Sequence, residues 1–128
     1  MLVTVALAAA TGCGGDDEPT AAEDEADITA VVLQDELGGA ERCSQIYTDS
    51  YLAENWNENV TAYPGTTPLE KCENDPPLEG VTEADVKISV DAIEGDTAVA
   101  SSKVRAGAAV AFTLVREDEG WRIAGFAD

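Results

Sequence analysis

The sequence predicts an α+β domain in which N-terminal helices pack on a curved antiparallel β-meander formed by the C-terminal part of the chain. Apolar residues recur at the helical spacing i, i+3, i+4 between Ile28 and Tyr51. From Val86 onward they instead alternate with polar residues at a period of two. Short turns rich in Gly, Asp and Glu separate the alternating segments, which predicts that consecutive strands are neighbours in one sheet.

The composition limits the function before any motif is considered. The chain has 128 residues, with 7 basic and 26 acidic residues, no histidine and a formal net charge of −19. This length favours a single domain. The negative charge excludes electrostatic binding to nucleic acid, which requires clustered Lys and Arg. Without histidine, the chain can form neither His-based zinc sites nor a Ser-His-Asp triad, and the sequence predicts no metal site and no cofactor.

The N-terminus is typical of an exported protein. Residues 1–12 contain no charged side chain, and Leu2 to Ala10 is apolar apart from Thr4. This run is too short to span a bilayer. The sequence Ala10-Thr11-Gly12-Cys13 resembles the lipobox of bacterial lipoproteins. The resemblance implies that residues 1–12 are a signal peptide and that Cys13 carries fatty acyl chains, palmitate among them, on the extracytoplasmic face of the bacterial cell membrane. The alternative is that the apolar run is a buried helix or strand.

The segment that follows is strongly acidic. Residues 13–26 contain Gly, Pro and many carboxylates but no basic residue. Such a segment repels itself and stays extended, so we expect a flexible tether that holds a domain of residues 27–128 away from the membrane.

Two helices are expected at the start of this domain. Thr20 and Glu23 have capping-box spacing, and Asp27 is a second possible N-cap, while Gly38-Gly39 supplies the stop. A second helix is predicted to start near Ala40, and its buried stripe comprises Cys43, Ile46, Tyr47, Ser50 and Tyr51. Four polar residues fall outside that stripe: Glu41, Arg42, Gln45 and Asp49.

An irregular segment separates the helices from the strands. Residues 54–81 are rich in Asn, Pro and Gly, which predicts loops with one short helical turn from Pro68 to Asn74. The alternating pattern then predicts four strands, at residues 86–91, 98–105, 110–115 and 121–126, joined by short turns.

This order of elements is similar to the NTF2-like, or SnoaL-like, cone. The local resemblance lies in Thr97-Ala98-Val99-Ala100, in Phe112-Thr113-Leu114-Val115-Arg116 and in Gly120-Trp121-Arg122-Ile123. It covers residues 27–128. The resemblance implies a curled sheet with a pocket between the helices and its concave face, although four strands are fewer than the family often has.

Two cysteines remain once Cys13 is assigned to the lipid. Outside the cytosol, two leftover thiols usually pair, so we expect a structural disulfide between Cys43 and Cys72. The bridge would attach the irregular segment to the second helix. A redox pair is the alternative, but CxxC spacing is absent.

The aromatic residues are the candidates for a binding pocket. Tyr47, Tyr51, Trp56 and Tyr63, with Phe112 on the third strand, could line it. Alternatively, Tyr47 and Tyr51 pack the helix on the sheet with their hydroxyls at the rim.

The polar candidates give no catalytic assignment. Asp49 and Asp91 lie on predicted elements, but neither has a reason to be buried, so we assign no catalytic residue. Lys87, Lys103 and Arg105 could form a small basic patch, either a solvated face or an anion site.

Two classes of function remain. The first is a membrane-tethered lipoprotein whose domain binds an envelope protein or a small apolar ligand without catalysis. The second is a small isomerase or hydrolase that uses a carboxylate in the cone. A structural envelope protein without a ligand is a third alternative. A cone filled by Tyr47, Tyr51 and Phe112 would favour binding, whereas an enclosed cavity with an inward carboxylate and a tyrosine would favour the enzyme.

Overall fold

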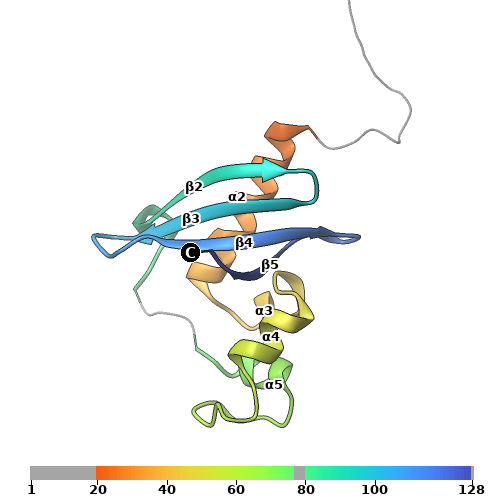
Figure 1. The fold of residues 1–128 in the computed structure, drawn as a ribbon. Helices are drawn as coiled ribbons and strands as arrows, with labels where there is room; N and C mark the ends of the chain where they lie inside the picture. The colour runs from red at the N-terminus through yellow and green to blue at the C-terminus, as the bar shows by residue number, and fades with distance from the viewer. Residues whose placement is uncertain (1–19, 77–79, 128) are drawn as a thin grey trace, which may run out of the picture.

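The computed structural model describes residues 20–76 and 80–127, and the fold within these ranges is α+β, as predicted. The helices are α2 (Ala21–Leu37), α3 (Arg42–Gln45), α4 (Asp49–Asn55) and α5 (Pro68–Glu73), with a 3₁₀ turn at Glu83–Asp85. The strands are β2 (Val86–Glu94), β3 (Thr97–Val104), β4 (Val110–Glu117) and β5 (Gly120–Phe126). In Figure 1, α2 crosses one face of the sheet, and α3, α4 and α5 gather below β5.

The four strands form the predicted antiparallel meander in the order β2-β3-β4-β5. The register places Ala98 opposite Leu114, and Leu114 opposite Ile123, so these buried side chains share the face that α2 covers. Asp91 interrupts the pairing of β2 with β3, because the register shifts between Val90 and Ala92.

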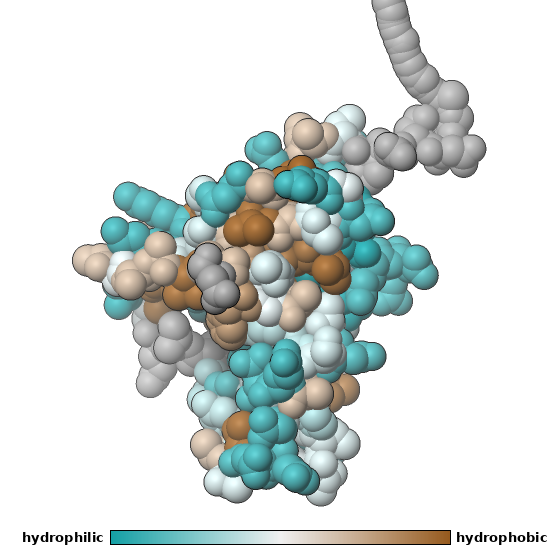
Figure 2. All heavy atoms as spheres, viewed as in Figure 1, coloured by the Kyte–Doolittle hydropathy of each residue, from teal (hydrophilic) through white to brown (hydrophobic). Residues whose placement is uncertain are grey.

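The opposite face of the sheet is only partly buried. Figure 2 looks onto this face and shows hydrophobic side chains among hydrophilic ones over the strands. Ala92, Val99 and Val115 help to line a shallow hollow of about 280 Å³ there. Alternation along the strands explains this arrangement, because every second side chain points away from α2.

Helix α2 begins earlier than the predicted domain boundary at residue 27. Thr20 is the N-cap: its hydroxyl accepts a hydrogen bond from the Glu23 amide, and Glu23 accepts one from the Thr20 amide. Residues 21–26, expected in the tether, therefore form the first turns of the helix. Tertiary contacts also hold these turns in place, since the carboxylate of Asp24 is buried and bound by Arg116 of β4.

The second predicted helix is divided into α3 and α4. Between them, Tyr47 forms a parallel bridge with Ile123 of β5. The Ile123 amide donates to the Ile46 carbonyl at 2.7 Å, and the Thr48 amide donates to the Ile123 carbonyl at 3.0 Å. Thr48 then caps α4 through its hydroxyl. Pairing with the sheet edge thus replaces one turn of a helix that the apolar spacing alone predicted to be continuous.

The two cysteines of the domain, Cys43 and Cys72, lie at disulfide distance, as predicted. The sulfur atoms of Cys43 and Cys72 are 2.05 Å apart, and both residues are fully buried. The bridge joins α3 to α5, whose first residue is Pro68 and whose N-cap is Thr67. The short helix predicted from Pro68 to Asn74 is therefore confirmed, and it is covalently attached beside α3.

Candidate functional site

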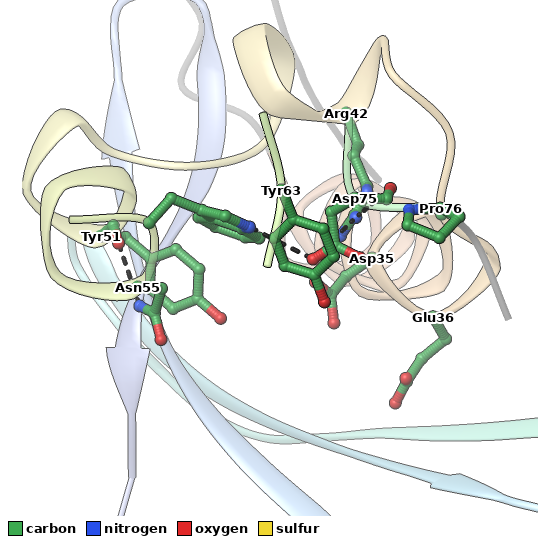
Figure 3. A pocket seen from close by; sticks show the side chains of 10 residues that line it. Asp35, Glu36, Arg42, Tyr51, Asn55, Tyr63, Asp75 and Pro76 are labelled. Carbon is green, nitrogen blue, oxygen red and sulfur yellow. Dashed lines mark hydrogen bonds and ion pairs between the residues drawn. The ribbon is translucent and has the colours of Figure 1, made fainter. Parts of the chain in front are cut away.

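A cavity of about 400 Å³ opens between the C-terminal end of α2 and the cluster formed by α3, α4 and α5. Its wall is contributed by the end of α2 and the residue after it, by α3, by α4 and the residue after it, and by the segment after α5: Asp35, Glu36, Gly38, Arg42, Tyr51, Asn55, Trp56, Asp75 and Pro76. Tyr63 comes from the loop between α4 and α5. In Figure 3 the hydroxyls of Tyr51 and Tyr63 and the carboxylate of Asp35 point to the same side.

The end of α2 brings two carboxylates to this cavity. Asp35 and Glu36 lie in its last turn, which contains no basic residue. The helix stops there because Gly38 and Gly39 have φ values of 80° and 106°, which side chains with a Cβ rarely adopt. The C-terminal end of a helix carries partial negative charge, so acidic residues there are unfavourable. The site therefore concentrates negative charge at a cost in stability.

Arg42 is the basic side chain in the wall, and its burial corrects the sequence analysis, which placed it outside the apolar stripe. Its side chain is only 8% exposed and lies between two aspartates, 3.9 Å from Asp35 and 4.0 Å from Asp75. It donates to the hydroxyl of Tyr47 at 2.7 Å. Its Nε has no hydrogen-bond partner among the described residues. One guanidinium thus faces several carboxylates and is itself incompletely bonded.

Asp35 has an unusual electrostatic environment. Burial raises the pKa of its carboxyl group above the usual value, and the nearby charge of Glu36 acts in the same direction. The hydrogen bond donated by the Tyr47 hydroxyl and the charge of Arg42 oppose this effect only in part. Burial, followed by the charge of Asp35, also raises the pKa of the Tyr47 and Tyr51 phenols, so both remain protonated donors.

The aromatic residues of the site form a stacked group. The rings of Tyr47 and Tyr51 are 4.8 Å apart and nearly parallel, and Trp56 lies 5.5 Å from Tyr47. The indole N–H of Trp56 donates to Asp75 at 3.2 Å, which holds the segment after α5 against α4. The aromatic group therefore fixes the wall and positions Asp75.

Three of the five aromatic candidates reach the cavity. Tyr51 and Trp56 line it, as does Tyr63, while Tyr47 and Phe112 do not. Tyr47 is fully buried, and its hydroxyl donates a hydrogen bond to Asp35 and accepts one from Arg42. Phe112 is buried in the core, and its ring centre lies 5.5 Å from that of Phe126, which is exposed. Tyr47 and Phe112 pack in the core because they lie between the helices and the sheet, so neither side chain faces the cavity.

The hydroxyl of Tyr51 differs from that of Tyr47. The residue is only 4% exposed, it lines the cavity, and its hydroxyl forms no hydrogen bond with any described residue. The surrounding protein leaves this hydroxyl without a partner, so it is available to a molecule that enters the cavity. The arrangement can offer a ligand one phenol donor beside a carboxylate.

The acidic and basic residues weighed from the sequence lie elsewhere. Asp49 is exposed at the start of α4. Asp91 is exposed on β2, where hydrogen bonds from Ser101 and Ser89 lower its pKa. Lys87 and Lys103 face each other across β2 and β3 and are both exposed, which is a solvated basic face.

Sequence reasoning missed Asp35, Glu36, Arg42 and Asp75. Their burial depends on contacts between segments far apart in the chain. One local signal existed, namely two carboxylates in the last turn before Gly38-Gly39, where a basic residue is expected. Among the residues described, no group of three His, Cys, Asp or Glu side chains is arranged to hold a metal ion.

The proposed lipid site at Cys13 lies outside the described residues, as do residues 1–12 and the first half of the predicted tether. No helix within the described ranges has the length and apolar character needed to cross a membrane. Compared with models of known families, with curated proteins and with solved structures, the chain gives no significant match. The site must therefore be interpreted from its own geometry.

Proposed function

We propose that this protein is a lipid-anchored protein of the extracytoplasmic face of the bacterial cell membrane, whose NTF2-like domain binds a small molecule without transforming it. The lipobox-like sequence ending at Cys13 supports the anchor, and the acidic run after it supports a spacer. The disulfide-distance pair Cys43 and Cys72 is consistent with an oxidising compartment. The helices laid over one face of an antiparallel meander support the NTF2-like interpretation.

One observation carries the binding function. The side chain of Tyr51 is almost fully buried, yet its hydroxyl opens into the cavity, which the carboxylate of Asp35 also lines, and it has no hydrogen-bond partner among the described residues. Small-molecule sites combine an apolar or aromatic wall with a few convergent polar groups, and this wall has both. Because polar residues contribute much of the lining, a small polar ligand fits better than the purely apolar ligand or the protein partner considered from the sequence alone.

Two measurements test this proposal. Replacing Cys13 with Ser in the full chain should move the protein from the membrane fraction to the soluble fraction without changing its unfolding transition. Equal membrane fractions for both proteins would end the anchor proposal. Mass spectrometry of molecules retained by the native protein purified from its own membranes should show a small molecule that is depleted in Tyr51→Phe. Retention only of a protein would contradict the small-ligand proposal.

A second candidate is an enzyme that transfers a proton through Asp35. The observation that favours it is the raised pKa of this carboxyl group, which lines the same cavity and receives a hydrogen bond from Tyr47. This candidate predicts that the chain accelerates exchange of α-protons of small ketones in deuterated water and that Asp35→Asn abolishes the acceleration. Exchange equal to that of the buffer would favour binding without catalysis.

A further inference from the structure

We propose that the ligand of this cavity is a small organic cation, an amine or ammonium group on a short apolar body, held between the carboxylates and the aromatic wall. The inference rests on the proposed function, because it names the chemical class that the same cavity would take.

The charges of the wall favour a cation. Among the described residues that line the cavity, three are carboxylic acids, Asp35, Glu36 and Asp75, and one is a guanidinium, which lies between two of these acids. That guanidinium, of Arg42, is shared between two of the acids at 3.9 and 4.0 Å, near the limit of an ion pair. The wall therefore has an excess of negative charge that the described residues do not neutralise. A cation in the cavity would supply the missing positive charge.

The end of α2 adds to this field. Its last-turn carbonyls carry partial negative charge, and the two acids beside them reinforce it. A helix of 17 residues that ends in acids, with no basic residue in its last turn, gains stability from a cation at that end. The same geometry opposes the binding of an anion.

The aromatic wall distinguishes an organic cation from a metal ion. Tyr51, Trp56 and Tyr63 present ring surface to the cavity, and the Arg42 guanidinium already lies 5.8 Å from the centre of the Trp56 ring. The site thus holds one cation against an aromatic ring within the protein itself. Aromatic faces attract an ammonium group and bury its apolar body, whereas a hydrated metal ion requires several oxygen ligands.

The Tyr51 hydroxyl supplies an independent observation. The Tyr51 side chain is buried, with only 4% of the residue exposed, and its hydroxyl opens into the cavity and forms no hydrogen bond with any described residue. A hydroxyl oxygen accepts hydrogen bonds, so it can receive one N–H of a primary amine while the carboxylates balance the charge. A primary amine should therefore bind more tightly than a quaternary ammonium of similar size.

The test uses the full chain and three probes of nearly equal size but different charge, namely benzylamine, benzyl alcohol and benzoate. Isothermal titration calorimetry at neutral pH should show benzylamine binding at least about tenfold more tightly than benzyl alcohol, with no measurable binding of benzoate. Benzyltrimethylammonium should bind more weakly than benzylamine. Calcium chloride at matched ionic strength should not displace benzylamine.

Variants connect the result to this cavity. Glu36→Gln keeps the size of the side chain and the acceptor for Ser102, and it should weaken benzylamine about tenfold. Asp91→Asn removes an exposed carboxylate of β2 that does not line the cavity and should leave the affinity unchanged. Each variant is compared with the native chain by its urea unfolding transition, so that misfolding is separated from a loss of charge.

The outcomes separate this inference from the proposed function. Equal affinity for benzylamine and benzyl alcohol would overturn the cation while leaving a small-molecule site intact. Displacement of benzylamine by calcium would overturn the organic class in favour of an inorganic ion. Equal weakening by Glu36→Gln and Asp91→Asn would assign the binding to the general acidity of the chain and would overturn the site. Failure of all three probes to bind would also overturn the inference that the ligand is an organic cation. In that case, mass spectrometry of the molecules retained by the native protein would still decide whether another small molecule is bound.

Discussion

Arg116 of β4 and Asp24 of α2 form a two-pronged ion pair that ties the first turn of the helix to the sheet. The Nη1 and Nη2 atoms of Arg116 lie 2.8 and 2.9 Å from the two carboxylate oxygens of Asp24. The indole N–H of Trp121 donates to the same carboxylate at 3.2 Å, and the guanidinium lies 4.5 Å from the centre of that indole ring. One acid, one guanidinium and one indole therefore fix where α2 lies on the sheet.

This ion pair should make stability depend on acid pH. The Arg116 hydrogen bond lowers the pKa of Asp24 below its usual value. The ion pair therefore contributes its full stabilisation above the pKa that Asp24 has in the unfolded chain. This stabilisation is lost as the pH falls through the lowered pKa of Asp24 in the folded state. Asp24→Asn should be less stable in urea than the native chain at neutral pH, and the difference should shrink with acidification. A difference that does not change with pH would contradict this assignment.

A matched control is Asp96→Asn. Asp96 also pairs with Arg116, at 3.1 Å, but its side chain is 80% exposed. Exposed pairs contribute little, so this variant should unfold at nearly the same urea concentration as the native chain.

Replacing Trp121 with Ala should lower the free energy of unfolding by about 3–5 kcal/mol, the range for truncation of a buried aromatic side chain. The residue is 3% exposed, and its loss also removes a donor from Asp24. Urea unfolding followed by circular dichroism measures the change. Trp121→Phe keeps most of the ring volume and should be less destabilising. A loss below about 1 kcal/mol for the alanine variant would mean that the indole is not part of the core.

Reducing the bridge between Cys43 and Cys72 should lower the free energy of unfolding by about 3–4 kcal/mol in the chain-entropy model. The two residues are separated by 29 positions, and the bridge attaches α5 and the loop before it to α3. The double variant Cys43→Ala, Cys72→Ala should show the same loss. Alkylation of the denatured, unreduced chain should label neither cysteine, and labelling of both would refute the bridge.

The affinity for benzylamine should fall as the pH is lowered from neutrality. Burial raises the pKa of Asp35, so this carboxyl group becomes neutral at a higher pH than an ordinary aspartate. Protonation removes negative charge from the cavity, and the cation binds less tightly below that raised pKa. The groups that surround Asp35 are Arg42, Tyr47, Glu36, Asp75 and Tyr51.

Calorimetry across acid pH measures this dependence. In Asp35→Asn the decline should begin at a lower pH, because the remaining carboxyl groups then determine it. An identical pH profile for the native chain and Asp35→Asn would contradict the assignment to Asp35.

Much of the fold was predictable because its signals are local. The caps at Thr20 and Thr67 act through backbone groups three residues away, and the alternation from Val86 onward specifies strands without reference to the rest of the chain. Because the turns between the strands are short, strands that are consecutive in the chain are neighbours in the sheet. Tyr51 and Trp56 were candidates for the wall because aromatic side chains near a helix either pack or line a space, but the sequence did not decide between these two roles.

The rest required the tertiary structure. Nothing in the sequence near Ile46 shows that β5 will pair there and interrupt the helix. Arg42 looked exposed because its two carboxylate neighbours come from α2 and from the segment after α5. Whether a charged side chain is buried depends on partners distant in sequence, and helical periodicity carries no information about them.

By itself, the sequence determined the class of the fold, the order of its strands, the cysteine pair and the acidic character of the chain, because each follows from local spacing or from composition. Only the tertiary structure decided where α2 lies on the sheet and which charges meet in the cavity. Asp24 and Asp35 lie on the same helix, yet Arg116 lowers the pKa of the first while burial raises that of the second. That difference arises because the pKa of a carboxyl group is set by its neighbours in space.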